Sequence, residues 1–512
     1  MAEQVSSANE VERKYDVDAG HVLPDLGGVD GVASAGQQEP ASLEATYYDT
    51  ADLRLRAARI TLRHRTGGSD AGWHLKLPSG RDREELRVEA PGEAVPDALT
   101  TLVRGWTRGA ELVPAARLST VRRVQLLLDP AGVPLLELAD DEVTACRISD
   151  GHELRWREWE AELLSGPRGL LDAVQERLLA AGAAPSSSAS KVGRVLTRPD
   201  EAATAAPWWA QARGRRPGES AATVVHAHLA EQVAELQSRH PHALRDRPDA
   251  VHKMRVATRR LRSALVTFRP LLDRARTDPL RDELRWLAGL LGEVRDAEVM
   301  HERLRGLVAA EPSELVLGDV LQQIDLELEQ RHRRAHAALV EVLAGQRYLQ
   351  LLDGLVQLVD DPPFQQVARG QAAPVLAGGM RRTWKRLDRA MAAAAECPPG
   401  PEQEERLHDV RKDAKRARYA AEALTPVFGR DAARFARAMT DLQESLGDVQ
   451  DGVATREVLR ELGARAHVSG RNGFTFGRLH ALEQARAVGA GADWPSARAA
   501  VSRHKLRRWF ER

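Results

Sequence analysis

The spacing of apolar residues changes along this chain, from short alternating runs in the first part to a helical period in the second. Up to about residue 165, apolar and charged residues alternate in short runs such as EVERKYDV (10–17), ITLRHR (60–65) and LRWREWEAEL (154–163). Such alternation is typical of half-buried antiparallel strands. From residue 219 onward, long segments rich in Ala, Leu, Arg and Glu repeat with a helical period. The sequence therefore predicts an α+β multidomain protein, with an N-terminal antiparallel β-barrel and a C-terminal all-α domain.

A chain of 512 residues exceeds one ordinary domain. We expect the β domain at 5–200, a linker at 201–218 and the helical domain at 219–510. The net charge of zero hides an asymmetry, because residues 1–200 contain 24 basic and 32 acidic residues, and residues 201–512 contain 50 basic and 42 acidic ones. Excess carboxylates suit metal ions, and excess cations suit a polyanion.

The helical half contains an internal repeat. VHKMRVATRRLRSAL (251–265) aligns with LHDVRKDAKRARYAA (407–421), so that His252 corresponds to His408 at an offset of 156. The segments 287–304 and 442–459 align at nearly the same offset. Two matching blocks predict a duplicated unit. We expect two four-helix bundles, at about 219–345 and 365–510.

Cysteine content and hydropathy indicate the compartment. Cys146 and Cys397 lie far apart with no metal-ligand spacing around them, which fits a reducing environment. No run of about 18 apolar residues is found, and the first residues contain no apolar signal segment. The sequence predicts a cytoplasmic protein with no membrane partner. The Gly-rich segment 20–42 is expected to be either a lid or disordered.

Charged residues gather on one face of the expected strands, because side chains two positions apart share a face. The sets are Glu10, Glu12 and Lys14; Thr61, Arg63 and Arg65; His74 and Lys76; Arg83, Glu85 and Arg87; Glu137 and Asp141; and Glu158, Glu160 and Glu162. These could be solvated faces of surface strands. In a closed barrel they would line the interior, where unpaired charges are costly. Divalent cations and a phosphate chain would satisfy both signs of charge.

Several motifs in this half resemble the CYTH family. They are E-x-E-x-K (10–14), YYDT (47–50), ITLRHR (60–65), GWHLKLP (72–78), E-x-E-x-E (158–162) and SK (190–191). The resemblance covers roughly 5–200 and implies a triphosphate-tunnel metalloenzyme. That family includes inorganic and thiamine triphosphatases, RNA triphosphatases and class IV adenylyl cyclases.

The resemblance implies a role for each matching residue. Metal binding, by Mg²⁺ or Mn²⁺, would fall to Glu10, Glu12, Glu158, Glu160, Glu162 and Asp141. Triphosphate binding would fall to Lys14, Arg63, Arg65, Lys76, Arg87, Arg122 and Lys191. The catalytic set would be Glu10, Glu12, Lys14, Glu85 and Glu160. The neighbours Arg123 and Asp140 remain alternatives to Arg122 and Asp141.

The repeated segments of the helical half have a basic face opposite an apolar face. With His252 at zero and 100° per residue, the basic residues of the first copy fall between 280° and 340° and its apolar residues between 160° and 220°. The second copy repeats this arrangement from His408. An ordinary solvated face would explain one such helix. Two matched copies favour a binding site for an extended polyanion.

These helices resemble the CHAD family, whose members bind inorganic polyphosphate on a basic surface. The resemblance covers roughly 219–510 and implies the polyphosphate contacts His252, Arg255, Arg259, Arg262, His408, Arg411, Lys412, Lys415 and Arg418. Neighbouring cations should keep the two His residues neutral. His332 and His336 have helical spacing, but the sequence supplies no third ligand, so no metal site is predicted there.

The leading hypothesis is an enzyme that hydrolyses inorganic triphosphate or short polyphosphate with a divalent metal. The helical half would recruit polyphosphate or place the enzyme on polyphosphate granules. The main alternative is a non-catalytic polyphosphate-binding protein. Adenylyl cyclase activity ranks lower because no nucleobase-recognition signal is found. RNA binding also ranks lower, since the basic face has few interleaved aromatics for base stacking.

Overall fold

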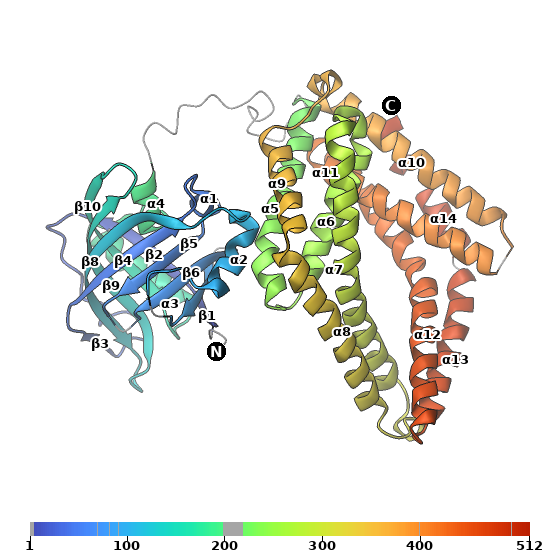
Figure 1. Cartoon of the computed structure of the whole chain (residues 1–512), viewed down its shortest axis with the longest axis horizontal. Helices are drawn as coiled ribbons and strands as arrows, with labels where there is room; N and C mark the ends of the chain where they lie inside the picture. Colours follow the sequence, from blue (N-terminus) through green and yellow to red (C-terminus); the bar gives the residue numbers. More distant parts are fainter. Residues whose placement is uncertain are drawn as a thin grey trace. The chain divides into compact units, whose positions relative to one another are not determined.

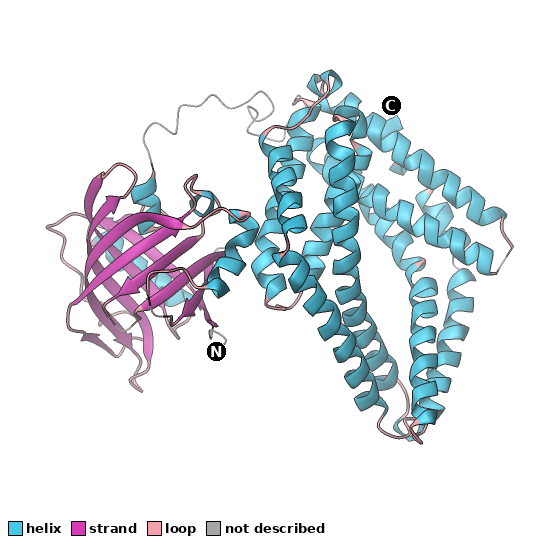
Figure 2. Cartoon of the chain, viewed as in Figure 1, coloured by secondary structure: helices cyan, strands magenta, loops and turns pink. Residues whose placement is uncertain are grey.

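The computed structural model describes residues 5–68, 70–80, 82–90, 92–197, 219–398, 400–492 and 494–511. The chain divides into two compact units, Met1–Thr204 and Ala205–Arg512. Strands dominate the first unit and helices form the second (Figure 2), so the α+β class is confirmed. The predicted linker, 201–218, lies outside the described residues. Among the helices described, none is long and apolar enough to cross a bilayer.

The first unit is an antiparallel sheet with short helices. Its strands are β1 (Val5–Glu10), β2 (Glu12–Val17), β3 (Ser34–Gln37), β4 (Ala41–Asp49), β5 (Thr61–Thr66), β6 (Gly72–Ser79), β7 (Asp82–Val88), β8 (Val113–Leu128), β9 (Pro134–Arg147), β10 (Glu153–Leu163) and β11 (Ala184–Pro185). Its helices are α1 (Arg54–Ala57), α2 (Asp97–Thr107), α3 (Arg168–Ala180) and α4 (Lys191–Leu196).

The sheet curls into a barrel-like shape, but hydrogen bonds do not close it. The strand order is β1-β7-β6-β5-β4-β8-β9-β10-β2-β11, with β3 added to β8 (Figure 1). β1 pairs with β7 and β2 pairs with β10, and only Val11 separates β1 from β2. The continuous segment Val5–Val17 thus pairs with strands at both ends of the sheet. The expectation of a closed barrel therefore needs a correction. Among the described strands, β1 and β2 are connected through the backbone of Val11, and no hydrogen-bonded pairing between two strands closes the sheet.

Part of the outer face of the sheet is apolar, and α3 covers this part. Trp159 of β10 is fully buried and packs with Val174 and Leu178 of α3. The segment 20–42 joins this core, since Leu26 is fully buried and β3 pairs with β8. The expectation that 20–42 is a lid or disordered is therefore wrong. Its apolar residues fill space over the sheet.

The inner face of the sheet is partly filled by α4. Ser190 caps this helix, with its Oγ accepting a hydrogen bond from the backbone N of Gly193 at 3.0 Å. Val195 packs against Leu118 and Val143, in a buried cluster that also includes Val192 and Leu196. In their strands, Leu118 and Val143 share a face with Arg122 and Asp141. α4 therefore closes one end of the interior and leaves charged residues around the rest.

The second unit is helical throughout. Its helices are α5 (Ala221–Leu244), α6 (Ala250–Thr267), α7 (Arg274–Ala309), α8 (Val320–Ala344), α9 (Gln346–Asp360), α10 (Ala372–Glu396), α11 (Pro401–Ser445), α12 (Gly447–Val468), α13 (Phe474–Ala492), α14 (Trp494–Val501) and α15 (Arg508–Glu511). α9 in the first half, and α14 and α15 in the second, add to the four helices expected in each.

The repeated helices α6 and α11 pack against each other. Arg260 Nη2 lies 3.0 Å from Glu422 Oε2 across this contact. α11 breaks at Gly429, whose φ of 54° a residue with a side chain rarely adopts. The segment 287–304 lies in the continuous helix α7, whereas its repeat, 442–459, crosses the boundary between α11 and α12.

Two long helical hairpins extend from this base. α7 pairs with α8, and α12 pairs with α13 (Figure 1). Their far ends share a buried apolar cluster that includes Leu307, Ile324, Leu462 and Phe476. The two halves therefore meet at α6–α11 and again at the hairpin ends.

Candidate active site

The register of the first unit brings opposite charges face to face. Three cross-strand pairs join opposite charges, Lys14 with Glu160, Lys76 with Glu85 and Arg122 with Asp141, whereas Glu12 lies opposite a second acid, Glu162. Directly opposed residues in antiparallel strands interact through their side chains. The alternation found in the sequence thus becomes a charged interior.

These residues line a small cavity that is open to solvent at its mouth. The lining residues are Glu10, Glu12, Lys14, Tyr47, Thr61, Arg63, Arg65, Asp70, Lys76, Arg83, Glu85, Arg87, Arg122, Glu160, Glu162, Ser190 and Lys191. Every sequence-predicted residue of this half is among them except Asp141 and Glu158. Those two carboxylates are buried and contact Lys191.

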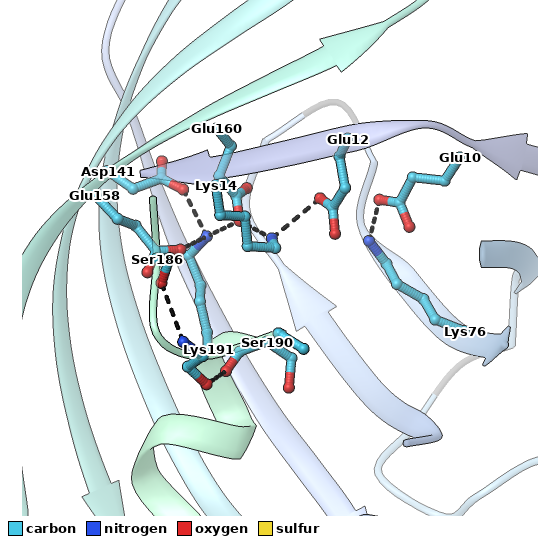
Figure 3. Close-up of polar contacts among 12 residues, drawn as sticks. Glu10, Glu12, Lys14, Lys76, Asp141, Glu158, Glu160, Ser186, Ser190 and Lys191 are labelled. Carbon is cyan, nitrogen blue, oxygen red and sulfur yellow. Dashed lines mark hydrogen bonds and ion pairs between the residues drawn. The ribbon is translucent and has the colours of Figure 1, made fainter. Parts of the chain in front are cut away.

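Lys191 lies among three buried carboxylates. Its Nζ is 2.9 Å from Asp141 Oδ2, 2.7 Å from Glu158 Oε1 and 2.6 Å from Glu160 Oε1 (Figure 3). Asp141, Glu158 and Glu160 are close enough together to hold a metal ion. A lysine ammonium already neutralises part of their charge, and it comes from the first residue of α4.

Two further cations reach the same carboxylates. Arg122 Nη2 is 2.7 Å from Asp141 Oδ2 and 2.8 Å from Glu160 Oε2. Lys14 forms ion pairs with Glu160 and, at 3.0 Å, with Glu12 (Figure 3). Despite burial, these positive charges lower the pKa of Glu160 well below its usual range. Glu160 is therefore ionised at neutral pH.

A second acidic group, Glu10, Glu12 and Glu162, has fewer cations. Glu10 pairs with Lys76, but its buried Oε2 atom has no hydrogen-bond partner. Glu162 forms no ion pair with any residue that the structure describes, and burial together with Glu10 and Glu12 raises its pKa to about 7. Buried carboxylates with unmatched charge are a suitable setting for a hard divalent cation. Among the described residues, Asp141, Glu158 and Glu160 are the acids of this unit whose oxygens lie within 4.8 Å of one another, and Glu10, Glu12 and Glu162 are the acids whose charge is less neutralised.

The opposite imbalance is found at Arg63 and Arg65. Both are buried, and the Nε atom of each has no hydrogen-bond partner. Arg63 donates to the Tyr47 hydroxyl at 3.4 Å, and Arg65 pairs with Asp70. Burial and the nearby Arg63 lower the pKa of Arg65. Two adjacent buried guanidinium groups with unused donors suit an anion such as phosphate.

Glu85 organises several of these cations. It accepts from Arg87 Nε at 2.7 Å, contacts His74 Nδ1 at 3.0 Å and lies 3.6 Å from Lys76 Nζ. Its pKa is lowered despite burial, chiefly by the hydrogen bond with His74 and the charge of Lys76. Glu85 therefore acts as a fixed negative charge between neighbouring cations.

The structure adds residues that received no role from the sequence. Tyr47 and Asp70 line the cavity and contact Arg63 and Arg65. Tyr47 lies in the YYDT motif, which the sequence analysis identified without giving Tyr47 a role. Asp70 lies in a Gly-rich turn and offered no periodic signal. Tertiary packing alone placed it at the site.

The second unit has a basic cleft between α6, α7, α10 and α11. Its lining includes Arg259, Arg262, Arg269, Arg281, Arg285, Arg386, Lys412, Lys415, Arg416 and Tyr419. Burial, followed by the surrounding arginines, of which Arg285 has the largest effect, lowers the pKa of Arg262. Arg281 and Arg285 of α7 and Arg386 of α10 were missed by the sequence analysis, because they lie outside the repeated segments.

Only part of the predicted polyphosphate set lines this cleft. Arg259, Arg262, Lys412 and Lys415 do, whereas His252, Arg255, His408, Arg411 and Arg418 do not. Arg255 instead lies 3.5 Å from Asp296. The pKa of His252 and that of His408 are lowered by burial first and by nearby Arg and Lys residues second. Both His residues are therefore mainly neutral at pH 7.

Comparison with known proteins identifies the class of each unit. The CYTH domain family matches residues 8–195, and the CHAD domain family matches residues 227–460. The first family includes triphosphatases and adenylate cyclases. Two Mycobacterium tuberculosis proteins, uncharacterized protein MT2285 of strain CDC 1551 and uncharacterized protein Rv2226 of strain H37Rv, are each 37% identical over 493 residues. These matches cover 93% of this chain and 92% of theirs. The chain belongs to the family of CYTH–CHAD two-domain proteins.

Two solved structures resemble the helical unit. One is described as PptA from Streptomyces chartreusis, at 22% identity and a TM-score of 0.45, covering 55% of this chain and 99% of that chain. The other is the CHAD domain from the plant Ricinus communis, at 23% identity and a TM-score of 0.46, covering 58% of this chain and 97% of that chain.

Proposed function

We propose that the first unit hydrolyses inorganic triphosphate or short polyphosphate with Mg²⁺ or Mn²⁺, and that the second unit binds polyphosphate. The main support is the separation of charge inside one cavity. Glu10, Glu12 and Glu162 leave a negative charge unmatched on one side, and Arg63 and Arg65 leave donors unused on the other. A metal–phosphate complex matches both.

The proposed metal site consists of Glu10, Glu12 and Glu162, with Glu160 beside it. Oxygen ligands of this type are those that Mg²⁺ and Mn²⁺ prefer. A bound divalent ion would offset charge on phosphate oxygens and lower the pKa of a bound water. Asp141 and Glu158 would act indirectly, because their ion pairs hold the Lys191 ammonium at the cavity wall.

The cations of the cavity would bind the phosphate chain. In the phosphate-free protein, Lys14, Arg122 and Lys191 point at carboxylates. These partners hold the cations in place, so that little reorganisation is needed when phosphate oxygens arrive. Arg63, Arg65, Lys76 and Arg87 would bind the remaining oxygens bidentately or as point charges. Fixed cations stabilise the charge that develops on the phosphoryl oxygens during in-line displacement.

The basic cleft of the second unit would hold a longer polyphosphate chain. Eight of its nine cationic side chains come from α6, α7, α10 and α11, and the ninth, Arg269, comes from the short turn after α6; no Asp or Glu is among the described residues that line it. Repulsion among like charges is relieved when an anion enters. Arg281, Arg285 and Arg386 extend the predicted set to helices α7 and α10. We further propose a cytoplasmic protein that associates with polyphosphate granules through this cleft.

The test is phosphate release from inorganic triphosphate, ATP and thiamine triphosphate, each with Mg²⁺ and with Mn²⁺. Wild type should release phosphate from triphosphate, and Glu12→Ala should reduce the rate at least 100-fold. Glu142→Ala is the matched control, because this carboxylate lies on the outer face and pairs with the exposed Arg123. Its activity should remain within twofold of wild type.

The alternatives give different results in the same assay. A non-catalytic binding protein would release no phosphate from any substrate and would still retain long polyphosphate on a filter. A cyclase would convert ATP into cyclic AMP and pyrophosphate. Either outcome would overturn the triphosphatase proposal, and the second would leave the metal and cation roles in place.

A further inference from the structure

A mixed His and carboxylate cluster lies in the second unit, apart from the residues that line the basic cleft. His332 and His336 are one turn apart on α8, Asp246 lies in the turn between α5 and α6, and Glu298 lies on α7. The sequence offered the His pair without a third ligand. The fold supplies carboxylates that are 86 and 34 positions away from His332.

The potential ligand atoms are close together. His332 Nε2 is 2.7 Å from Asp246 Oδ2, and His336 Nε2 is 3.8 Å from Asp246 Oδ1. Glu298 Oε1 is 4.0 Å from His332 Nδ1, and Asp246, Glu298 and His332 each offer an atom within 4.8 Å of the others. Ligands of a tetrahedral ion with bonds of about 2.0–2.1 Å lie about 3.3 Å apart. Since Asp246 contacts Nε2 of His332 and Glu298 faces Nδ1 of the same ring, an ion held between Asp246 and Nε2 would require Glu298 to turn toward it.

The cluster has more negative charge than its positive neighbours offset. Glu298 pairs with Arg295 at 2.8 Å, and no ion pair between Asp246 and an Arg or Lys is found among the described residues. His332 Nδ1 is buried and has no hydrogen-bond partner. The hydrogen bond from His332 to Asp246 and that from His336 to the Ala243 carbonyl, at 2.8 Å, explain two contacts without a metal. These two hydrogen bonds do not explain why Glu298 lies beside His332 Nδ1, which has no hydrogen-bond partner.

We propose that Asp246, His332 and His336, with Glu298, bind one divalent cation of the zinc type. Two imidazoles with carboxylates favour Zn²⁺, Co²⁺ or Ni²⁺ over Mg²⁺, because nitrogen ligands suit softer ions. The tunnel site consists of carboxylates alone, so the two sites should select different metals. This inference does not depend on the proposed phosphatase activity.

The site would join three segments at the beginning of a repeated helix. Asp246 lies three residues before Asp249, the residue that precedes α6, and both have positive φ, of 50° and 62°. Non-Gly residues in this region cost free energy that neighbouring contacts must offset. A bound ion would fix the turn against α7 and α8. Metal binding should therefore stabilise the folded second unit.

The test uses the full chain with Mg²⁺ in excess, so that carboxylate sites are saturated. Zn²⁺ is added in a calorimeter, and Co²⁺ is added separately to record its visible absorption. Wild type should bind one additional equivalent and show a Co²⁺ band of tetrahedral intensity. His332→Ala should weaken Zn²⁺ binding at least tenfold and abolish the band.

His301→Ala is the matched control. His301 Nε2 lies 2.7 Å from Asp325 Oδ1, in a similar His–Asp pair between α7 and α8 that is not part of the cluster. This variant should bind Zn²⁺ as wild type does. His336→Gln serves as a second variant if His332→Ala melts lower than wild type without metal. Equal Zn²⁺ affinity in wild type, His332→Ala and His336→Gln would overturn the proposal, as would no binding by wild type.

Discussion

Arg122 and Asp141 lie directly opposite each other on β8 and β9, and two parallel hydrogen bonds join them at 2.8 Å and 2.7 Å. Asp141 has no exposed side-chain surface, so this pair is held inside the sheet. Their sequence neighbours form different pairs, Arg123 with the exposed Glu142 and Asp140 with Arg157. The alternation of the strands therefore assigns Arg122 and Asp141 to the inner face of the sheet, where Arg122 lines the cavity.

Replacing Arg122 should destabilise the first unit. Arg122→Met leaves Asp141 with Lys191 as its remaining cation, and removing one partner of a buried ion pair costs about 3 kcal/mol. Arg123→Met removes an exposed pair and should change the free energy of unfolding by about 0.5 kcal/mol at most. Urea denaturation of the two variants measures the difference. Equal losses of unfolding free energy in the two variants would mean that burial of the Arg122–Asp141 pair does not add to its effect on stability.

The contribution of Glu162 to the stability of the metal-free first unit should fall as the pH rises from 4.5 to 7, whereas His74 of the same unit, whose pKa is lowered chiefly by burial, contributes in the opposite direction. Glu162 has a folded-state pKa of about 7, above its ordinary value of 4.5, because of burial and the adjacent Glu10 and Glu12. The folded state therefore binds this proton more tightly than the unfolded chain, and the advantage is lost as the carboxyl ionises. The loss could reach about 3 kcal/mol, at about 1.4 kcal/mol per pKa unit.

Glu162→Gln tests the source of this pH dependence. In EDTA, the free energy of unfolding of Glu162→Gln minus that of wild type should rise between pH 4.5 and 7, as measured by urea denaturation at each pH. Glu142→Gln, on the outer face, should follow wild type. Saturating Mg²⁺ should reduce the difference between Glu162→Gln and wild type, since a cation favours the ionised carboxylate. Parallel curves for wild type and Glu162→Gln would contradict the assignment.

Polyphosphate binding should depend on Arg285 as strongly as on Lys415. Both line the basic cleft, although only Lys415 lies in a repeated segment. Replacement of either by Ala should weaken binding several-fold at low salt, and the difference should shrink as salt screens the charges. Arg333→Ala is a control on an exposed face of α8, where Arg333 pairs with Glu329. Fluorescence anisotropy of labelled polyphosphate at several KCl concentrations measures these effects.

The end closed by α4 should determine how a phosphate chain is cleaved. Val192, Val195 and Leu196 fill one end of the interior, so a chain can enter only from the other end. Hydrolysis of long polyphosphate should then release single terminal phosphates. Gel electrophoresis of a chain of defined length should show stepwise shortening. Products cut at the middle of the chain would contradict entry from one end.

The sequence predicted the position of a residue only where that residue lies in a segment with a regular pattern of side chains. Strand alternation predicted the inner positions of Glu158, Glu160 and Glu162, and the helical repeat predicted that Arg262 and Lys415 share a basic surface. Asp70 and Arg285 were missed because neither lies in a periodic segment that marks its face. The prediction of a closed barrel was wrong in this detail. The alternation of charged residues continues from Glu10 to Glu12, so the sequence does not reveal that the strand is interrupted at Val11.

By itself, the sequence determined the class of each unit, the sets of charged residues and the repeat. These depend on side-chain periodicity, which follows from the geometry of strands and helices. The tertiary structure alone decided which charges are paired. Lys191 lies among Asp141, Glu158 and Glu160, while Glu162 forms no ion pair among the described residues, although Glu158, Glu160 and Glu162 belong to one motif. It also placed Asp246 beside His332, because contacts between distant segments depend on how the elements pack.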